Sequence, residues 1–371
     1  MFTFLIILAL LILAFFIKYP HFINFLQFGL PKTDHYTAFP YKTIKALRPQ
    51  LLQTSSIYPI TIKNQQTLTQ FKDYKTLAFL VIKNQHLLTE EYFNISFEEK
   101  INSFSASKSI LSILIGIAID QQAIKSLDQK VAPFFPELVL SEQLTIRHLL
   151  TMSSGLKWNE NFLSPLSDVA IAYYTNNLWK QVKKTKSIYS PGQRFSYKCL
   201  NSILLGQIIE RATNIPIYQF AEKYLWTPIG AEYNAFWTTD KYNITKTFCC
   251  LYATARDFAK IGLLLLNKGF YNNKQIVSKF YIEQMLTPAT FLKDKNGDIV
   301  DYYGLHIWFT KFKGQIIPYI RAMHGQYVFI LQKQNSIIVR LGQKRSLKMI
   351  DHTPEDVFIY LDAAWDIIHK T

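Results

Sequence analysis

The sequence predicts an α+β fold of the α/β-sandwich type, in which an antiparallel sheet is flanked by helices and interrupted by an all-helical insertion. The order of hydrophobic patterns indicates this fold: a strand hairpin, a long helical block, a second strand block and a final helix. Strands about two hundred residues apart share one sheet only if the helices between them are an insertion. Hydrophobic residues make up 49% of the 371 residues and charged residues 18%, which suits a packed core.

The amino terminus is an apolar segment. Residues 1–17, MFTFLIILALLILAFFI, carry no charged side chain and precede Lys18. Their length is at the short end for crossing a hydrocarbon core of ~30 Å, and no small-x-small cleavage site follows them. We expect residues 1–19 to be an uncleaved membrane anchor. A cleaved signal segment and a buried helix of a soluble protein are the alternatives.

A connecting or wrapping segment is expected over residues 20–75, which are polar, punctuated by proline and without clean periodicity. The domain expected over residues 76–371 begins with LAFLVIKNQHLLTEEY, which predicts two strands joined by a turn near Asn84 and Gln85. Helical patterns then dominate, and the helical insertion is expected at about 121–290.

Strand patterns return after the helical block. They are YYGLHIWFT, IIPYIRAMHGQYVFIL and SIIVRLGQ, all rich in β-branched and aromatic residues. The chain closes with PEDVFIYLDAAWDIIHK, which predicts a helix with Pro354 near its first turn.

The net charge is +15, from 41 Lys and Arg against 26 Asp and Glu. Nucleic-acid binding is nevertheless disfavoured, because the densest basic cluster does not lie along one recognition helix. That cluster is Lys180, Lys183, Lys184, Lys186 and Arg194. We expect a solvated helix face there. The alternative is a pocket rim that attracts anionic substrates or lipid head groups.

The cysteines are Cys199, Cys249 and Cys250. An odd number with two adjacent members cannot make a disulfide framework, so burial must stabilise the fold. No histidine lies at ligand spacing from them, and no metal site is expected. Cys249 and Cys250 are expected to be buried small apolar groups.

The first motif that could carry chemistry is SASK, from Ser105 to Lys108, at the start of an apolar helical run. A serine in the first turn of a helix has a free N–H at the positive end of the dipole, where an oxyanion would be stabilised. A lysine three residues later can reach the hydroxyl, and burial would disfavour its ammonium form, as a base requires. The structural alternative is an N-cap serine with a solvated lysine.

Two further segments could contribute to a site. Tyr197 follows the turn-forming Pro191-Gly192 on a loop that leads into a helix, where a tyrosine could equally be a packing residue. His324 lies in RAMHGQY, and a glycine within a strand often marks the close approach of a ligand. A lone histidine is more often structural than catalytic.

Together and in this order, the SASK, YKCLN and HGQY segments resemble the serine β-lactamase and penicillin-recognising hydrolase family. The closer likeness is to its branch of class C enzymes, esterases and 6-aminohexanoate-dimer hydrolases. TIRHLLTMSSGLKW and LYATARDFAKIGLLLLNKG also resemble the family's pattern, and the resemblance covers about residues 60–371. It implies a β-lactamase/transpeptidase-like fold.

The resemblance also implies roles for single residues. Ser105 would be the acylated nucleophile, Lys108 its base and Tyr197 the hydroxyl that carries the proton to the leaving group. The oxyanion would lie between the N–H of Ser105 and one from the strand around Met323. The expected substrate-binding residues are Cys199, Asn201, Met323, His324, Gly325 and Gln326. Acyl transfer through a serine ester needs neither a metal nor an organic cofactor.

Two departures from the family pattern bear on the substrate. Cys199, a poor hydrogen-bonding group, stands where class C enzymes have asparagine and many esterase relatives have serine. Ile320-Arg321-Ala322 stands where β-lactamases have Lys-Thr-Gly, so the cation that attracts a penicillin carboxylate is displaced or absent. Efficient β-lactam hydrolysis is therefore not expected, and Ala322 leaves a catalytically weakened homologue open.

The sequence thus predicts a serine hydrolase that cleaves a small amide, ester or peptide. We expect it to be anchored to a membrane through residues 1–17, with its catalytic domain on the extracytoplasmic side. The alternative is a non-catalytic or weakly active penicillin-binding-like protein that recognises peptidoglycan-type or D-amino-acid peptides. The sequence indicates no oligomeric state.

Overall fold

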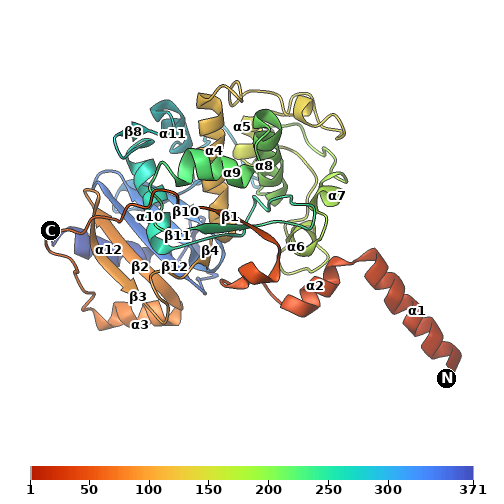
Figure 1. The fold of residues 1–371 in the computed structure, drawn as a ribbon, viewed down its shortest axis with the longest axis horizontal. Coiled ribbons are helices and arrows are strands. Elements are labelled where there is room, and N and C mark those ends of the chain that lie inside the picture. The colour runs from red at the N-terminus through yellow and green to blue at the C-terminus, as the bar shows by residue number, and fades with distance from the viewer. Residues whose placement is uncertain (1, 371) are drawn as a thin grey trace.

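The computed structural model describes residues 2–370, which are built around a six-stranded sheet (Figure 1). The strand order is β3-β2-β12-β11-β10-β9, and every neighbouring pair is antiparallel. The strands are β2 (Thr76–Lys83), β3 (His86–Tyr92), β9 (Trp308–Phe312), β10 (Gln315–Arg321), β11 (Tyr327–Leu331) and β12 (Ser336–Gly342). The expected hairpin is confirmed, since Asn84 and Gln85 join β2 to β3 with positive φ.

Helices cover both faces of this sheet. α3 (Gln65–Asp73) and α12 (Val357–Ile368) pack on one face, where the rings of Phe71 and Tyr360 lie 5.0 Å apart. α10 (Ala255–Leu266) packs on the other face. Successive side chains of a strand point to opposite faces of the sheet. Because both faces are buried, almost every residue of the central strands is apolar, and no alternation with polar residues is seen.

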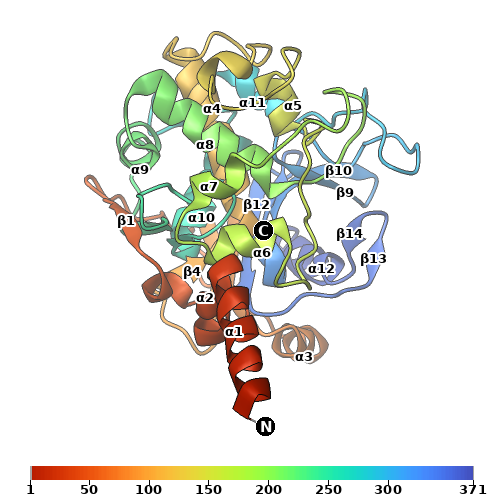
Figure 2. The same ribbon diagram turned by 90° about the vertical axis from the view of Figure 1, so that its right-hand side faces the viewer.

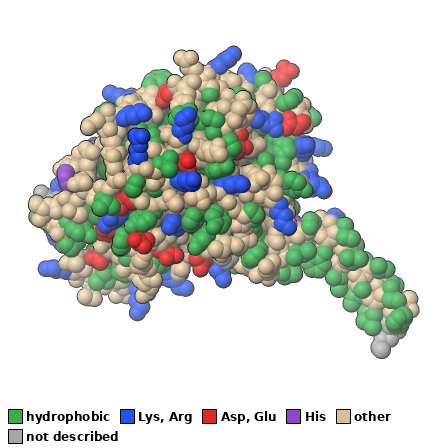
Figure 3. Space-filling view, viewed as in Figure 1, with side chains coloured by type: hydrophobic (Ala, Val, Ile, Leu, Met, Phe, Trp, Pro, Cys, Tyr) green, Lys and Arg blue, Asp and Glu red, His purple; other side chains and the backbone are tan. Residues whose placement is uncertain are grey.

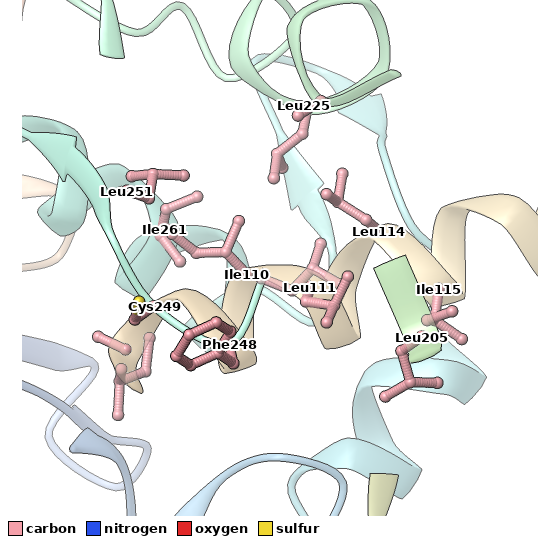
Figure 4. Packing of buried hydrophobic residues seen from close by; sticks show 14 of the residues in the cluster. Ile110, Leu111, Leu114, Ile115, Leu205, Leu225, Phe248, Cys249, Leu251 and Ile261 are labelled. Carbon is pink, nitrogen blue, oxygen red and sulfur yellow. The ribbon is translucent and has the colours of Figure 1, made fainter. Parts of the chain in front are cut away.

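The helical block surrounds α4 (Ser107–Asp120), which is apolar on nearly every side and therefore buried (Figure 4). Ile110, Leu111 and Leu114 of this helix belong to the main core, together with Leu205 of α8. The predicted helical patterns are confirmed here. The remaining helices of the block are α5 (Ile146–Leu150), α6 (Asp168–Tyr174), α7 (Leu178–Val182), α8 (Cys199–Thr213), α9 (Ile217–Ala221) and α11 (Lys279–Met285).

A second sheet, with strand order β1-β5-β6-β4, joins the helical block to the rest of the domain. Its strands are β1 (Tyr41–Ile44), β4 (Ile101–Asn102), β5 (Ala235–Thr238) and β6 (Leu251–Ala253). The span 121–290 therefore differs from the expected all-helical insertion, since it holds β5, β6 and the hairpin of β7 (Phe270–Tyr271) and β8 (Lys274–Gln275). Such short strands give no readable period of two.

Three predicted elements are shorter than their sequence patterns. β9 begins at Trp308, because His306 has a φ of +57° and turns the chain out of the strand conformation. The one-turn helix η5 (Met323–Gly325) separates β10 from β11 within the run that read as one strand. The last helix begins at Val357, and Pro354 lies in β14 (Thr353–Pro354), which pairs with β13 (Met349–Ile350).

The amino-terminal helix projects from the body of the protein. α1 (Phe2–Lys18) has no buried residue and forms an apolar rod (Figure 3), while α2 (His21–Phe28) packs on α6 (Figure 2). Within residues 2–370 no single helix is long and apolar enough to cross a membrane. α1 and α2 pass this test only as a pair, bent by 95°.

The two adjacent cysteines differ from their expectation. Cys249 and Cys250 are buried, as expected, but they form a disulfide with each other. A bond between neighbouring residues links no two elements of the fold. Burial therefore remains the main source of stability, as the sequence predicted.

Candidate active site

Ser105 lies in a sharp turn that precedes α4. It belongs to the one-turn helix η2 (Phe104–Ala106), so it stands just before the α-helix and not in its first turn. Phe104 has a φ of +44°, a region that bulky side chains rarely adopt, and its N–H donates to the side chain of Asn102 at 2.8 Å. Strained backbone of this kind is common at functional sites, and here it directs Ser105 into a pocket.

Lys108 is buried beneath this turn. Its residue is 2% exposed, which excludes the solvated lysine of the structural alternative. The Nζ atom lies 3.0 Å from Ser105 Oγ, 2.6 Å from the Phe248 carbonyl oxygen and 3.5 Å from Cys199 Sγ. The amine is thus held by three neighbours, one of which is the serine hydroxyl.

Tyr197 completes the cluster from the loop before α8. Its ring stacks on Trp308 at 5.7 Å and lies 5.2 Å from Lys108 Nζ. Burial raises the pKa of Tyr197 well above its usual range, and its hydrogen bond with Ser105 lowers that pKa only in part. The phenol is therefore protonated near neutral pH and able to donate a hydrogen bond.

A cavity of about 420 Å³ opens beside Ser105. Cys199, Met323 and His324 line it, so four of the predicted site residues share one pocket. The His324 ring packs on Phe104 at 5.0 Å and keeps the η5 turn beside Ser105. Among residues 2–370, no acceptor receives the backbone N–H of Ser105 or of Met323. Two unpaired backbone donors therefore belong to residues that line this pocket.

Lys108 and Tyr197 do not line this pocket, and neither do the other three predicted substrate-binding residues, which brace the site from behind. The Gln326 side chain donates to the Gly342 carbonyl at 2.6 Å and accepts the Gly342 N–H at 3.1 Å. Asn201 accepts a hydrogen bond from the Ser154 hydroxyl at 2.7 Å. Gly325 has a φ of +81° and lies against the Arg340 guanidinium, so no side chain fits there.

Arg340 is a fully buried cation that sequence reasoning missed. Its guanidinium donates to the carbonyls of His324 at 2.8 Å and Gly325 at 2.7 Å, and to the Tyr74 carbonyl at 2.6 Å. Carbonyl partners satisfy the donors of a buried charge and fix the η5 turn in place. The only sequence signal was an arginine within the apolar strand pattern SIIVRLGQ.

Glu160 is a second residue that sequence reasoning missed. Its carboxylate accepts the Cys199 N–H at 2.9 Å and the Cys199 Sγ–H at 2.7 Å, at the first residue of α8. Burial raises the pKa of Glu160, and the nearby charge of Lys108 opposes this shift. Cys199, expected to be a poor hydrogen-bonding group, thus contacts both Glu160 and Lys108.

The cations that the sequence suggested for substrate binding do not line the pocket. Arg321 stacks on Trp308 at 3.5 Å and donates to the His352 carbonyl. The four lysines of the basic cluster are exposed, as expected of a solvated face, whereas Arg194 is half-buried with its guanidinium 3.9 Å from the Tyr189 ring. None of the five is among the described residues that line the pocket. Within residues 2–370 no group of three or more His, Cys, Asp or Glu side chains could hold a metal ion.

Comparison with known proteins finds relatives across the domain. A family model described as Beta-lactamase matches residues 64–355. A 6-aminohexanoate-dimer hydrolase from Paenarthrobacter ureafaciens is 25% identical over 287 residues, which cover 72% of this chain and 72% of that protein.

Two solved structures are similar in fold. A protein assigned as a 6-aminohexanoate-dimer hydrolase from Bacillus anthracis has a TM-score of 0.76 and 23% identity, covering 91% of this chain and 93% of its own. A family VIII carboxylesterase has a TM-score of 0.64 and 15% identity, covering 81% of this chain and 95% of its own. These likenesses confirm the predicted fold.

Proposed function

This chain belongs to the beta-lactamase family, and from that premise we propose that it cleaves an amide or ester through a covalent ester on Ser105. The observation that carries this proposal is the contact of 3.0 Å between Ser105 Oγ and the buried amine of Lys108. A hydroxyl becomes a nucleophile only when a base takes its proton, and this amine is the group in reach.

In the acylation step, Lys108 acts as the base. The Lys108 ammonium must first lose a proton to solvent. The neutral amine can then donate its two N–H bonds to the Phe248 carbonyl and Cys199 Sγ, which leaves the lone pair for the Ser105 proton. The Ser105 oxygen then bonds to the substrate carbonyl carbon. The free N–H groups of Ser105 and Met323 support an oxyanion site for the resulting negative charge.

Tyr197 would carry the proton onward. Its protonated phenol forms a hydrogen bond with Ser105, and its ring lies 5.2 Å from Lys108 Nζ. It could therefore donate to the departing nitrogen or oxygen and regain the proton that Lys108 took, through Ser105. The leaving group then departs with the proton of the phenol. Water attacks the Ser105 ester in the second step, and the same groups return its proton to Ser105.

We also propose that α1 anchors the domain at a membrane, with the domain on the extracytoplasmic side. The support is an apolar helix that has no buried residue and projects from the domain. Flotation of the full chain with liposomes tests the anchoring. Recovery of the full chain in the unbound fraction would contradict it.

A fluorophosphonate probe tests the nucleophile, because it labels activated serines. Wild type should be labelled, and Ser105→Ala should not. Ser107→Ala is the matched control, since Ser107 lies in the same motif and its hydroxyl donates to the Phe104 carbonyl. Equal labelling of Ser105→Ala, or no labelling of wild type, would contradict the proposal and favour the non-catalytic alternative.

A further inference from the structure

We propose that the substrate is an ester with an uncharged, apolar acyl chain, and that residues 25–31 together with the loop 162–165 form its acyl-binding pocket. This inference rests on the proposed function of Ser105. The residues 25–31 lie outside the segment that matches the family model. They therefore give this chain a pocket wall that the family motifs do not describe.

The lining of the cavity is mainly apolar. Phe25 and Leu30 form one wall, Phe162 and Leu163 a second, and Phe248 contributes near Ser105. Phe162 and Leu163 are also exposed, which is unusual for neighbouring large apolar side chains on a loop. A volume of about 420 Å³ is in the range of small-molecule sites. Such a surface binds an alkyl chain by removing it from water.

The same cavity offers no charged side chain to a charged substrate group. Among residues 2–370, no Lys, Arg, Asp or Glu lines it. Four cations lie within two residues of a lining residue. Three are engaged elsewhere, since Lys198 donates to the Leu156 carbonyl, Lys246 to the Tyr173 carbonyl and Arg321 to the His352 carbonyl. The fourth, Lys32, is exposed and does not line the cavity. An ionised group in this pocket would lose its hydration without gaining an opposite charge.

Within the described part of the chain, His324 is the one lining residue that could gain a positive charge. Its ring lies 3.3 Å from the Pro31 carbonyl, and burial lowers its pKa. Two arginines, Arg340 and Arg345, face it from neighbouring segments and also lower that pKa. The imidazole is therefore neutral at pH 7.5 and offers a carboxylate no counter-charge.

The amino-terminal segment is fixed where an acyl chain would contact it. His21 bonds to the Pro165 carbonyl at 3.0 Å, and Phe25 packs on Tyr174 at 5.5 Å. The His324 contact with Pro31 holds the other end of the segment. The wall is thus attached to the loop 162–165 and to the η5 turn, on the side from which α1 projects (Figure 1).

Hydrolysis of p-nitrophenyl esters by the full chain tests this inference. From acetate to decanoate, kcat/KM should rise by about fourfold per methylene until the pocket is filled, as expected for a buried CH₂. An ester of equal length with a terminal carboxylate should react at least about a hundredfold more slowly. A flat chain-length profile, or preference for the carboxylate ester, would overturn the inference.

Two matched variants locate the pocket. Leu30 and Leu51 are each 68% exposed, but only Leu30 lines the cavity. Leu30→Lys should lower the ratio of decanoate to acetate kcat/KM at least about tenfold, and Leu51→Lys should leave both values unchanged. An unchanged ratio in Leu30→Lys refutes the assigned wall. Fluorophosphonate labelling of Ser105 in each protein separates this failure from a failure of the proposed function, which would abolish labelling of wild type.

Discussion

Protonation of His306 should destabilise the helices that carry the proposed catalytic groups. This imidazole is buried, donates from Nδ1 to the Leu150 carbonyl at 2.8 Å and accepts the Ser202 hydroxyl at 2.9 Å on Nε2. Its own carbonyl accepts the Ser109 hydroxyl at 2.6 Å. It therefore connects α4, α5 and α8. Burial first, and the charge of Lys108 second, lower the pKa of His306 from 6.5 to about 3.

The pH dependence of stability follows from this shift. The unfolded histidine gains a proton below pH 6.5, whereas the folded one stays neutral until about pH 3, so stability is lost as the pH falls. Each pH unit in this window corresponds to about 1.4 kcal/mol, so the fall from pH 7.5 to pH 5 removes about 2 kcal/mol through His306.

Urea unfolding of wild type and His306→Asn at pH 7.5 and pH 5 measures this contribution. The free-energy gap between the two proteins should shrink by about 2 kcal/mol at the lower pH. Taking the difference in unfolding free energy between the two proteins cancels groups that both contain. One of these is Asp257, whose pKa burial raises to about 6 and whose effect on the pH dependence has the opposite sign. Ser202→Ala keeps the imidazole and should retain the wild-type slope. A gap that is equal at the two pH values would refute this reasoning.

Two further substitutions test residues that only the structure identifies. Arg340→Met leaves the carbonyls of the η5 turn without donors, so urea unfolding should show a loss of about 3 kcal/mol or more; a loss below about 1 kcal/mol would contradict the bracing role. Glu160→Gln removes a carboxyl group whose pKa burial raises in the folded protein. The unfolded chain loses this proton above about pH 4.5 while the folded protein keeps it, so wild type should lose stability relative to the variant as the pH rises. A wild-type-to-variant difference that stays constant between pH 4.5 and 7.5 argues against that contribution.

Local patterns predicted much of the fold because their signals are short-range. The hairpin at Asn84 and the helices of the insertion follow from apolar periodicity and turn residues that lie together in the sequence. Strands such as β5 and β6 escaped prediction because partners far along the chain define them.

The same division holds for the candidate site. Ser105 and Lys108 were found because one helical turn places them in contact. Glu160 and Arg340 were not found, because their roles rest on hydrogen bonds with Cys199 and with the η5 turn. Only tertiary packing brings these partners together. The apolar wall of residues 25–31 has no motif at all, since any large apolar side chains in that position would form it.

The central claim is that an acyl group is transferred to Ser105. Rapid quenching of wild type with p-nitrophenyl decanoate, followed by intact-protein mass spectrometry and peptide mapping, measures this directly. We predict a mass increase equal to one decanoyl group, located on Ser105 and absent from Ser105→Ala. Turnover of the ester with the adduct on another residue, or with the same adduct in Ser105→Ala, would contradict the account.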